Sequence, residues 1–159
     1  MSAQLQTEFE LYEVLPVLTE VLESGGEFRL YPKGTSMLPL ICAGEDSVLL
    51  AKCEELTLNG MYLYRRKNGK FVLHRLVAFE KNGDPVFRGD NQTRLEHGIT
   101  RADVIAAVCG VFKKDVPYPL DSREYRAYLR RLSSPVCRFF RFFPRRVKGK
   151  LAQMMKKPR

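Results

Sequence analysis

Three short segments of the chain carry side chains that could together cleave a peptide bond. The first, Gly34-Thr35-Ser36-Met37-Leu38-Pro39, places a serine in a turn bounded by glycine and proline. The second is the pair His74-Arg75, and the third is the turn Gly89-Asp90-Asn91. A serine hydroxyl is a weak nucleophile unless a neighbouring base takes its proton. In this order the segments supply a nucleophile, a base and a carboxylate that could orient the base.

Ser36 is the candidate nucleophile. The turn around it could fix the position of its hydroxyl and leave backbone N–H groups facing a developing oxyanion. We therefore assign Thr35, Met37 and Pro39 to the predicted substrate and oxyanion site. The alternative is a strand-to-loop turn in which the serine only caps a following helix.

His74 is the candidate base. It lies in the run Phe71–Phe79, in which both alternating faces are largely apolar, and this pattern predicts a central and therefore rigid strand. The alternative is a histidine whose only role is in the core. Arg75 points to the opposite face and is expected to pair with a carboxylate or brace the sheet.

Two acids are candidates for the group that orients His74. Asp90 is first a turn residue, because Asp side chains bond to their own backbone; its functional role would be to fix the site or to orient the histidine. Glu96 follows six residues later and is longer. Asp46, at the start of an expected strand, is predicted to cap a turn.

The ordered segments resemble the signal peptidase I family, within the serine-peptidase clan that includes the self-cleaving domains of SOS and phage repressors. The likeness is to the endoplasmic-reticulum and archaeal branch, in which histidine replaces the lysine base of the bacterial enzymes. On this resemblance Ser36 matches the nucleophile, His74 the base, and Asp90 falls on the Gly-Asp-Asn box. The catalytic aspartate of the family lies a few residues beyond that box, where this chain has Glu96.

The chain departs from the family in two places. Gln92-Thr93-Arg94-Leu95-Glu96-His97 replaces the serine- and aspartate-rich continuation of the box. An expected helix precedes the β domain where membrane signal peptidases carry an anchor and repressors a DNA-binding helix-turn-helix. We therefore expect a cytoplasmic serine endopeptidase that cleaves a leader or precursor peptide through a Ser-His dyad. The alternative is a catalytically inactive relative that binds a peptide or a partner protein.

Hydrophobic periodicity predicts the elements that must hold these segments. Leucines and valines at three- and four-residue spacing predict a helix within residues 1–26, with Pro16 near its first turn and Gly25-Gly26 at its end. Asn68-Gly69 and Asn82-Gly83 predict hairpins in which both turn residues have positive φ.

Short apolar runs predict about six strands in a mainly antiparallel β domain over residues 27–116, a fold similar to that of signal peptidases and repressor-cleavage domains. The runs are Phe28–Leu30, Val48–Leu50, Met61–Tyr64, Phe71–Phe79, Val86–Arg88 and Val104–Phe112.

Pro117 and Pro119 predict a linker, followed by a basic amphipathic helical tail within residues 117–159. Residues 1–120 hold 14 Lys/Arg and 16 Asp/Glu, a balance of −2, and residues 121–159 hold 13 and 2, a balance of +11. Residues 125–155 are therefore expected to dock on an anionic membrane surface or a membrane protein, or to pack on the β domain. Nucleic-acid binding is disfavoured, because the arginines alternate with an apolar stripe that favours burial.

The four cysteines are far apart and include no Cys-x-x-Cys pair. We therefore expect free thiols in a reducing compartment and no metal site or other cofactor.

Overall fold

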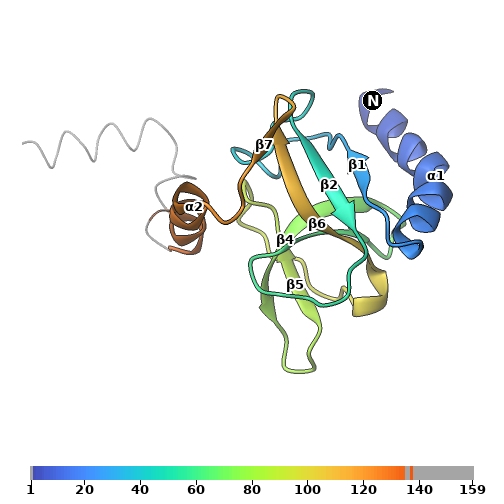
Figure 1. Cartoon of the computed structure of the whole chain (residues 1–159). Helices are drawn as coiled ribbons and strands as arrows, with labels where there is room; N and C mark the ends of the chain where they lie inside the picture. Colours follow the sequence, from blue (N-terminus) through green and yellow to red (C-terminus); the bar gives the residue numbers. More distant parts are fainter. Residues whose placement is uncertain (1, 135–136, 138–159) are drawn as a thin grey trace, which may run out of the picture. The chain divides into compact units, whose positions relative to one another are not determined.

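A computed structural model describes residues 2–134 and 137 of the chain (Figure 1). A boundary after Leu120 divides the chain into two compact units. The first unit contains helix α1 (Ser2–Glu23) and, in chain order, β1 (Phe28–Leu30), β2 (Ser47–Ala51), β3 (Met61–Arg65), β4 (Phe71–Phe79), β5 (Pro85–Arg88), a 3-10 turn (Arg101–Asp103), β6 (Val104–Lys113) and β7 (Val116–Tyr118). The second contains helix α2 (Arg123–Ser133).

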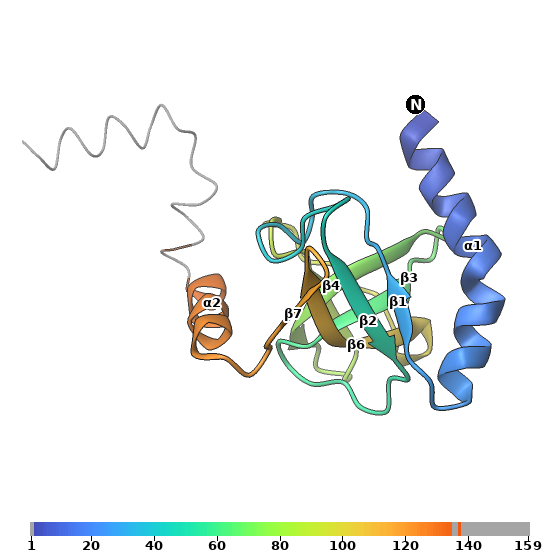
Figure 2. The same ribbon diagram turned by 45° about the horizontal axis from the view of Figure 1, so that its top comes forward.

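The strands of the first unit form one antiparallel sheet. Their order is β1-β2-β6-β3-β4-β5, and β7 pairs with β6. The predictions of a mainly β fold, of a helix before it and of a helix after it are confirmed. Figure 2 shows β1, an outer strand, lying next to α1.

Helix α1 is longer than its apolar pattern indicates. It begins at Ser2, so Pro16 lies inside the helix and not in its first turn as predicted. One backbone hydrogen bond is lost there, while the next turn is held by Leu18 and Leu22, which are both buried. The predicted end is confirmed: Gly25 has a φ of +80°, and the N–H of Gly26 bonds to the carbonyl of Val21 at 2.8 Å, which is a Schellman cap.

The hairpin β3–β4 fixes the register of the strand that carries His74. It pairs Tyr64 with Val72 and Tyr62 with His74. The hairpin itself was predicted from Asn68-Gly69, but only the glycine has positive φ, at +89°. The connection is therefore a longer loop that ends in a left-handed glycine, and not the predicted two-residue turn. The Asn82-Gly83 hairpin between β4 and β5 has the same form, with φ of +87° at Gly83.

β7 was not predicted. Pro117 suggested a linker, yet it lies in a strand that pairs, among the described strands, only with β6, and a missing N–H is tolerated on such an outer strand. Lys114 and Asp115 have φ of 48° and 67°, which makes a tight turn from two residues that are not glycine. The predicted domain end at residue 116 therefore falls within β7.

One cluster of the core lies on the β3–β4–β5 part of the sheet. Tyr64 stacks on Phe87 with ring centroids 4.4 Å apart, and Tyr62, Leu76 and Ile99 complete the buried cluster. His74 shares this face with Tyr62 and Leu76, because side chains two residues apart on a strand point the same way.

In the second unit, α2 begins at Arg123 and is capped by Ser122, whose hydroxyl accepts a hydrogen bond from the N–H of Tyr125 at 3.0 Å. The remainder of the predicted amphipathic tail lies outside the described residues. None of the described helices combines the length and the apolar character that a membrane crossing would require.

Candidate active site

Ser36 lies in the loop between β1 and β2, and the Gly-Asp-Asn turn holds this loop in place. The N–H of Asn91 donates to the carbonyl of Ser36 at 2.7 Å, and its side-chain amide donates to the carbonyl of Thr35 at 3.1 Å. A Cβ on residue 89 would lie 2.8 Å from the Ser36 carbonyl oxygen, so this close approach requires Gly89. Hydrogen bonds from Asn91 to the backbone carbonyls of Thr35 and Ser36 thus hold the first and third sequence segments together.

The far end of the same loop is held by Asp46, the predicted turn cap. Its carboxylate accepts hydrogen bonds from the N–H of Cys42 at 2.7 Å and from the ammonium of Lys113 on β6. The Lys113 ammonium also donates to the carbonyl of Leu40 at 2.7 Å. Hydrogen bonds at both ends therefore restrain the position of Ser36.

Ser36 and His74 line the same hollow, which we call the catalytic hollow and which has a volume of about 340 Å³. Its lining comes from the Ser36 loop, the β3–β4 hairpin and β4: Pro32, Lys33, Gly34, Ser36, Met37, Ile41, Arg66, Lys70, Phe71, Val72, Leu73, His74 and Gln92. His74 is almost fully buried and Ser36 is half-buried. A hydroxyl and an imidazole that meet at one solvent-accessible hollow are the minimum set for a serine nucleophile with a base.

Glu96 is the acid that lies beside His74. Its Oε1 is 3.3 Å from Nδ1 of His74. The hydroxyl of Tyr64 lies 3.1 Å from the same nitrogen and donates to Oε2 of Glu96 at 2.6 Å. Because the Tyr64 hydroxyl donates its hydrogen to Glu96, it can only accept a hydrogen bond from His74. Nδ1 of His74 must therefore carry a proton to donate. In the neutral imidazole, the lone pair then lies on the other ring nitrogen, Nε2.

Arg66 holds Glu96 from the other side. Its Nε donates to Oε2 of Glu96 at 2.9 Å, and its Nη2 contacts Oε1. Burial would raise the pKa of Glu96, but hydrogen bonds with His74, Arg66 and Tyr64 outweigh it and hold that pKa far below its ordinary value. Burial and the neighbouring Glu96 carboxylate raise the pKa of Tyr64, so the phenol stays protonated. Glu96 is therefore a carboxylate across the neutral range.

Asp90 lies with Arg75, on the other face of β4. Its two oxygens accept hydrogen bonds from Nε and Nη2 of Arg75 at 2.8 and 2.7 Å, and both side chains are 1% exposed. Arg75 also donates to the carbonyl of Asn59 at 2.5 Å. Because Arg75 follows His74 directly, the two side chains point to opposite faces. Asp90 thus braces the Gly-Asp-Asn turn, and Glu96 is the acid at the histidine.

The three predicted oxyanion-site residues occupy different places. Met37 is buried and lines the catalytic hollow. Thr35 and Pro39 are exposed and are not among the described residues that line it. The carbonyl of Thr35 accepts a hydrogen bond from the N–H of Leu38 at 3.3 Å, which closes the turn around Ser36.

Sequence reasoning missed Tyr64 and Arg66. Tyr64 was predicted only as part of an apolar run, and no role was predicted for Arg66. The signal was available, because the β3–β4 hairpin register places Tyr64 two residues from the partner of His74 and on the same face.

The described residues contain no group of three or more His, Cys, Asp or Glu side chains that could hold a metal ion. All four cysteines are free thiols. No protein-family model matches the chain, and no curated protein sequence matches it significantly.

Proposed function

We propose that this protein is a serine endopeptidase that cleaves a leader or precursor peptide with Ser36, His74 and Glu96. The observation that carries the proposal is the meeting of Ser36 and His74 at one hollow, with the Glu96 carboxylate 3.3 Å behind the imidazole. A carboxylate beside a histidine, with a serine at the same hollow, provides the three groups of a hydrolase triad.

The reaction follows from the proton positions. Nε2 of His74 accepts the proton of Ser36 as Oγ attacks the carbonyl carbon of the scissile peptide bond. Backbone N–H groups near Ser36 stabilise the resulting oxyanion. The imidazolium then gives its proton to the leaving amine, and an acyl-enzyme on Ser36 remains. Water, activated by the same nitrogen, hydrolyses the ester and restores the serine.

Glu96 has two roles in this scheme. It accepts a hydrogen bond from the Nδ1–H of His74 and so favours the tautomer in which Nε2 is the base. Its negative charge also stabilises the imidazolium that forms when Ser36 is deprotonated. Tyr64 and Arg66 are positioning residues, because they hold the Glu96 carboxylate and do not touch the reacting atoms.

Two open strand segments near the catalytic hollow support an extended peptide substrate. β1 is an outer strand of the described sheet and leads into the Ser36 loop. β5 pairs with β4 only from Arg75 onward, so among the strands of the described residues the half of β4 that carries Leu73 and His74 pairs only with β3. A peptide could add to either segment by backbone hydrogen bonds, a common mode of peptide recognition.

We propose a cytoplasmic location at the inner face of a membrane. This part of the proposal rests on charge alone, since residues 121–159 carry 13 Lys/Arg against 2 Asp/Glu. Basic segments of this kind are attracted to anionic lipid surfaces.

The decisive experiment incubates purified protein with a proteome-derived peptide library and reads the new termini by mass spectrometry. The wild type is expected to generate new termini that Ser36→Ala does not. Ser133→Ala, which removes an exposed serine of α2, is the matched control and should cleave like the wild type. Cleavage by Ser36→Ala, or none by the wild type, would refute the peptidase and favour the non-catalytic peptide-binding protein.

A further inference from the structure

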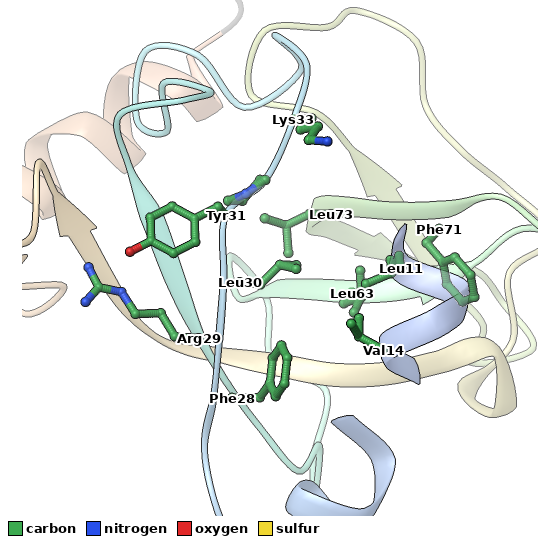
Figure 3. A pocket seen from close by; sticks show the side chains of 11 residues that line it. Leu11, Val14, Phe28, Arg29, Leu30, Tyr31, Lys33, Leu63, Phe71 and Leu73 are labelled. Carbon is green, nitrogen blue, oxygen red and sulfur yellow. The ribbon is translucent and has the colours of Figure 1, made fainter. Parts of the chain in front are cut away.

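A second pocket adjoins the catalytic hollow. It has a volume of about 310 Å³ and shares Pro32, Lys33, Phe71 and Leu73 with the lining of the hollow. Figure 3 shows the side chains of this apolar pocket coming from α1, β1, β3 and β4 and from the loop after β1. Because Leu73 directly precedes His74 in β4, the wall that the two spaces share lies next to the proposed base.

The wall of the apolar pocket is mostly hydrocarbon, and part of it is still exposed. Leu63 and Leu73 are buried members of this wall. Five further apolar residues of the wall are only half-buried: Leu11, Val14, Phe28, Leu30 and Phe71. The guanidinium of Arg29, which also belongs to the lining, donates to Asp115, so its charge is compensated. A concave apolar surface of this kind favours the burial of an apolar group.

Helix α1 closes one side of the apolar pocket. Leu11 and Val14 lie three residues apart, so they share one face of the helix, and both line the pocket (Figure 3). Tyr12 attaches the helix to the β3–β4 hairpin. Its ring packs edge-on against Phe71 with centroids 4.9 Å apart, and its hydroxyl donates to the carbonyl of Gly69 at 3.2 Å. These contacts hold Leu11 and Val14 in place at the pocket.

The strands beside the pocket favour a peptide over other apolar ligands. Phe28 and Leu30 belong to β1, an outer strand of the described sheet. Phe71 and Leu73 belong to the half of β4 that pairs, among the described strands, only with β3. Strand edges of this kind bind extended peptides through backbone hydrogen bonds. Successive side chains of an extended chain point to opposite faces, so one side chain can enter the pocket while a neighbouring peptide bond lies at the catalytic hollow.

We propose that the apolar pocket receives a bulky aliphatic or aromatic side chain of the peptide substrate, and that Leu11 and Val14 of α1 limit the size of that side chain. The volume lies at the low end of the range of about 300–1,000 Å³ for ligand pockets, which suits one large side chain. A small side chain such as that of alanine would leave the half-buried wall uncovered. The inference rests on the proposed function, since it names the substrate class of that same site.

Binding is tested with the full chain carrying Ser36→Ala, so that no probe is consumed. The probes are fluorescent, uncharged peptides of alanine and serine whose central residue is alanine, leucine or phenylalanine, and their binding is measured by anisotropy. The leucine and phenylalanine peptides are expected to bind about 10- to 100-fold more tightly than the alanine peptide, which is the gain that full burial of such a side chain provides. A fourth probe, the alanine peptide with an N-terminal octanoyl chain, tests for an acyl ligand.

Variants of α1 locate the effect. Val14→Phe, added to the Ser36→Ala chain, fills part of the pocket and should remove most of the advantage of the leucine and phenylalanine peptides. Val17→Phe adds the same ring to the same helix, at a position that is 55% exposed and is not among the described lining residues, and should change nothing. Val14→Ala enlarges the pocket and should favour the phenylalanine peptide over the leucine peptide. Circular dichroism checks the fold, and Val14→Ala keeps the test decisive if Val14→Phe does not fold.

The outcomes separate the inference from the proposed function. Equal affinity for the alanine, leucine and phenylalanine peptides, equal effects of Val14→Phe and Val17→Phe, or no binding of any peptide would each overturn the inference. Tighter binding of the octanoyl peptide than of the leucine peptide would assign the pocket to an acyl chain and overturn it as well.

Cleavage by the wild type completes the comparison. If the wild type cleaves library peptides with no enrichment of bulky apolar residues at a fixed position near the cut, the inference fails and the peptidase stands. If the Ser36→Ala protein prefers the leucine and phenylalanine peptides, and Val14→Phe removes that preference, but the wild type cleaves nothing, the peptidase fails and the pocket stands.

Discussion

Oε1 of Glu96 lies 3.3 Å from Nδ1 of His74, although Glu96 belongs to the segment after β5 and His74 to the middle of β4. Strand pairing explains why these two side chains lie close together. Leu76 of β4 pairs with Phe87 of β5, and Phe87 forms a bridge with Glu96. Residues paired across strands point to one face, so Glu96 joins the face that carries Leu76 and His74.

Ser36 and His74 should be jointly indispensable. Ser36→Ala and His74→Ala are each expected to abolish cleavage, and the double variant should be no worse, because members of a catalytic pair act as a unit. Turnover of a library-derived peptide measures this. His74 is buried, so circular dichroism must show a folded variant, and His74→Gln serves as a more conservative second change. A folded His74→Ala protein with near-normal turnover would make His74 a core residue only.

Glu96→Gln should reduce kcat by about 10²–10⁴-fold and leave the protein folded. The amide can no longer stabilise the imidazolium or fix the tautomer of His74, and the equivalent change in a serine-protease triad costs about 10⁴-fold. Single-turnover kinetics on the same peptide provide the measurement. A wild-type rate would show that Ser36 and His74 act without a third residue.

The depressed pKa of Glu96 predicts how stability depends on pH. Its pKa in the folded protein lies below the value in the unfolded chain, about 4.3, so the unfolded state binds more protons near that pH. The stabilisation by ionised Glu96 is therefore complete above that value and is lost as pH falls below it. Urea titrations should show a constant stability gap between wild type and Glu96→Gln above about pH 5, and a gap that narrows steadily as the pH falls below that value. A gap that does not change would mean that Glu96 has an ordinary pKa.

Asp90 should contribute to stability more than to chemistry. Asp90→Asn leaves the buried guanidinium of Arg75 without its carboxylate, and breaking a buried pair in this way costs about 3–5 kcal/mol. Urea unfolding of Asp90→Asn measures the loss. The double variant with Arg75→Met is expected to recover part of it, because the uncompensated charge is gone. A loss below about 1 kcal/mol would show that the pair does not brace the turn.

The sequence predicted the local features of the site better than its long-range contacts. Asn-Gly dipeptides located both hairpins, and the order of the three segments, together with the resemblance to signal peptidases, selected Ser36 and His74 as candidates. The sequence did not decide whether Asp90 or Glu96 lies beside His74. That decision depends on which residue after Phe87 pairs with the sheet again. Once that register is known, the alternation of side chains along the strands distinguishes the two acids. Glu96 forms a β-bridge with Phe87 and lies on the face of His74, while Asp90 forms an ion pair with Arg75 on the other face.

Arg66 should support catalysis at a distance. Arg66→Gln removes two hydrogen bonds to Glu96, and hydrogen bonds to charged groups contribute about 1.5–3 kcal/mol, so kcat is expected to fall by about 10- to 100-fold with little change in KM. Arg65→Gln is the matched control, since the neighbouring arginine is exposed and is not among the described residues of the hollow. Equal losses in the two variants would indicate a general effect of charge on the hairpin.

The basic tail should bind anionic membranes. Each Lys or Arg near such a surface contributes about 1 kcal/mol, and each buried Phe side chain about 1.5–3 kcal/mol. Residues 121–159 contain 13 Lys/Arg together with Phe139, Phe140, Phe142 and Phe143. If a third of the basic residues and two of these phenylalanines engage, the sum is about 7–10 kcal/mol, which is comparable to the roughly 8 kcal/mol of a micromolar association.

Co-sedimentation with vesicles of anionic lipid distinguishes two possibilities: the tail docks on the membrane, or it packs on the protein itself. Docking predicts binding that weakens as salt rises, because counterions screen the lysines and arginines, and that disappears when the chain is cut before Asp121. Vesicles of neutral lipid are the control. The contrary result is no binding to anionic vesicles at low salt, together with a tail that resists protease in the free protein. This result would show that the apolar stripe is buried against the protein itself. The excess of arginine favours the membrane, since a stripe that only packs on protein needs no balance of +11 on its solvated side.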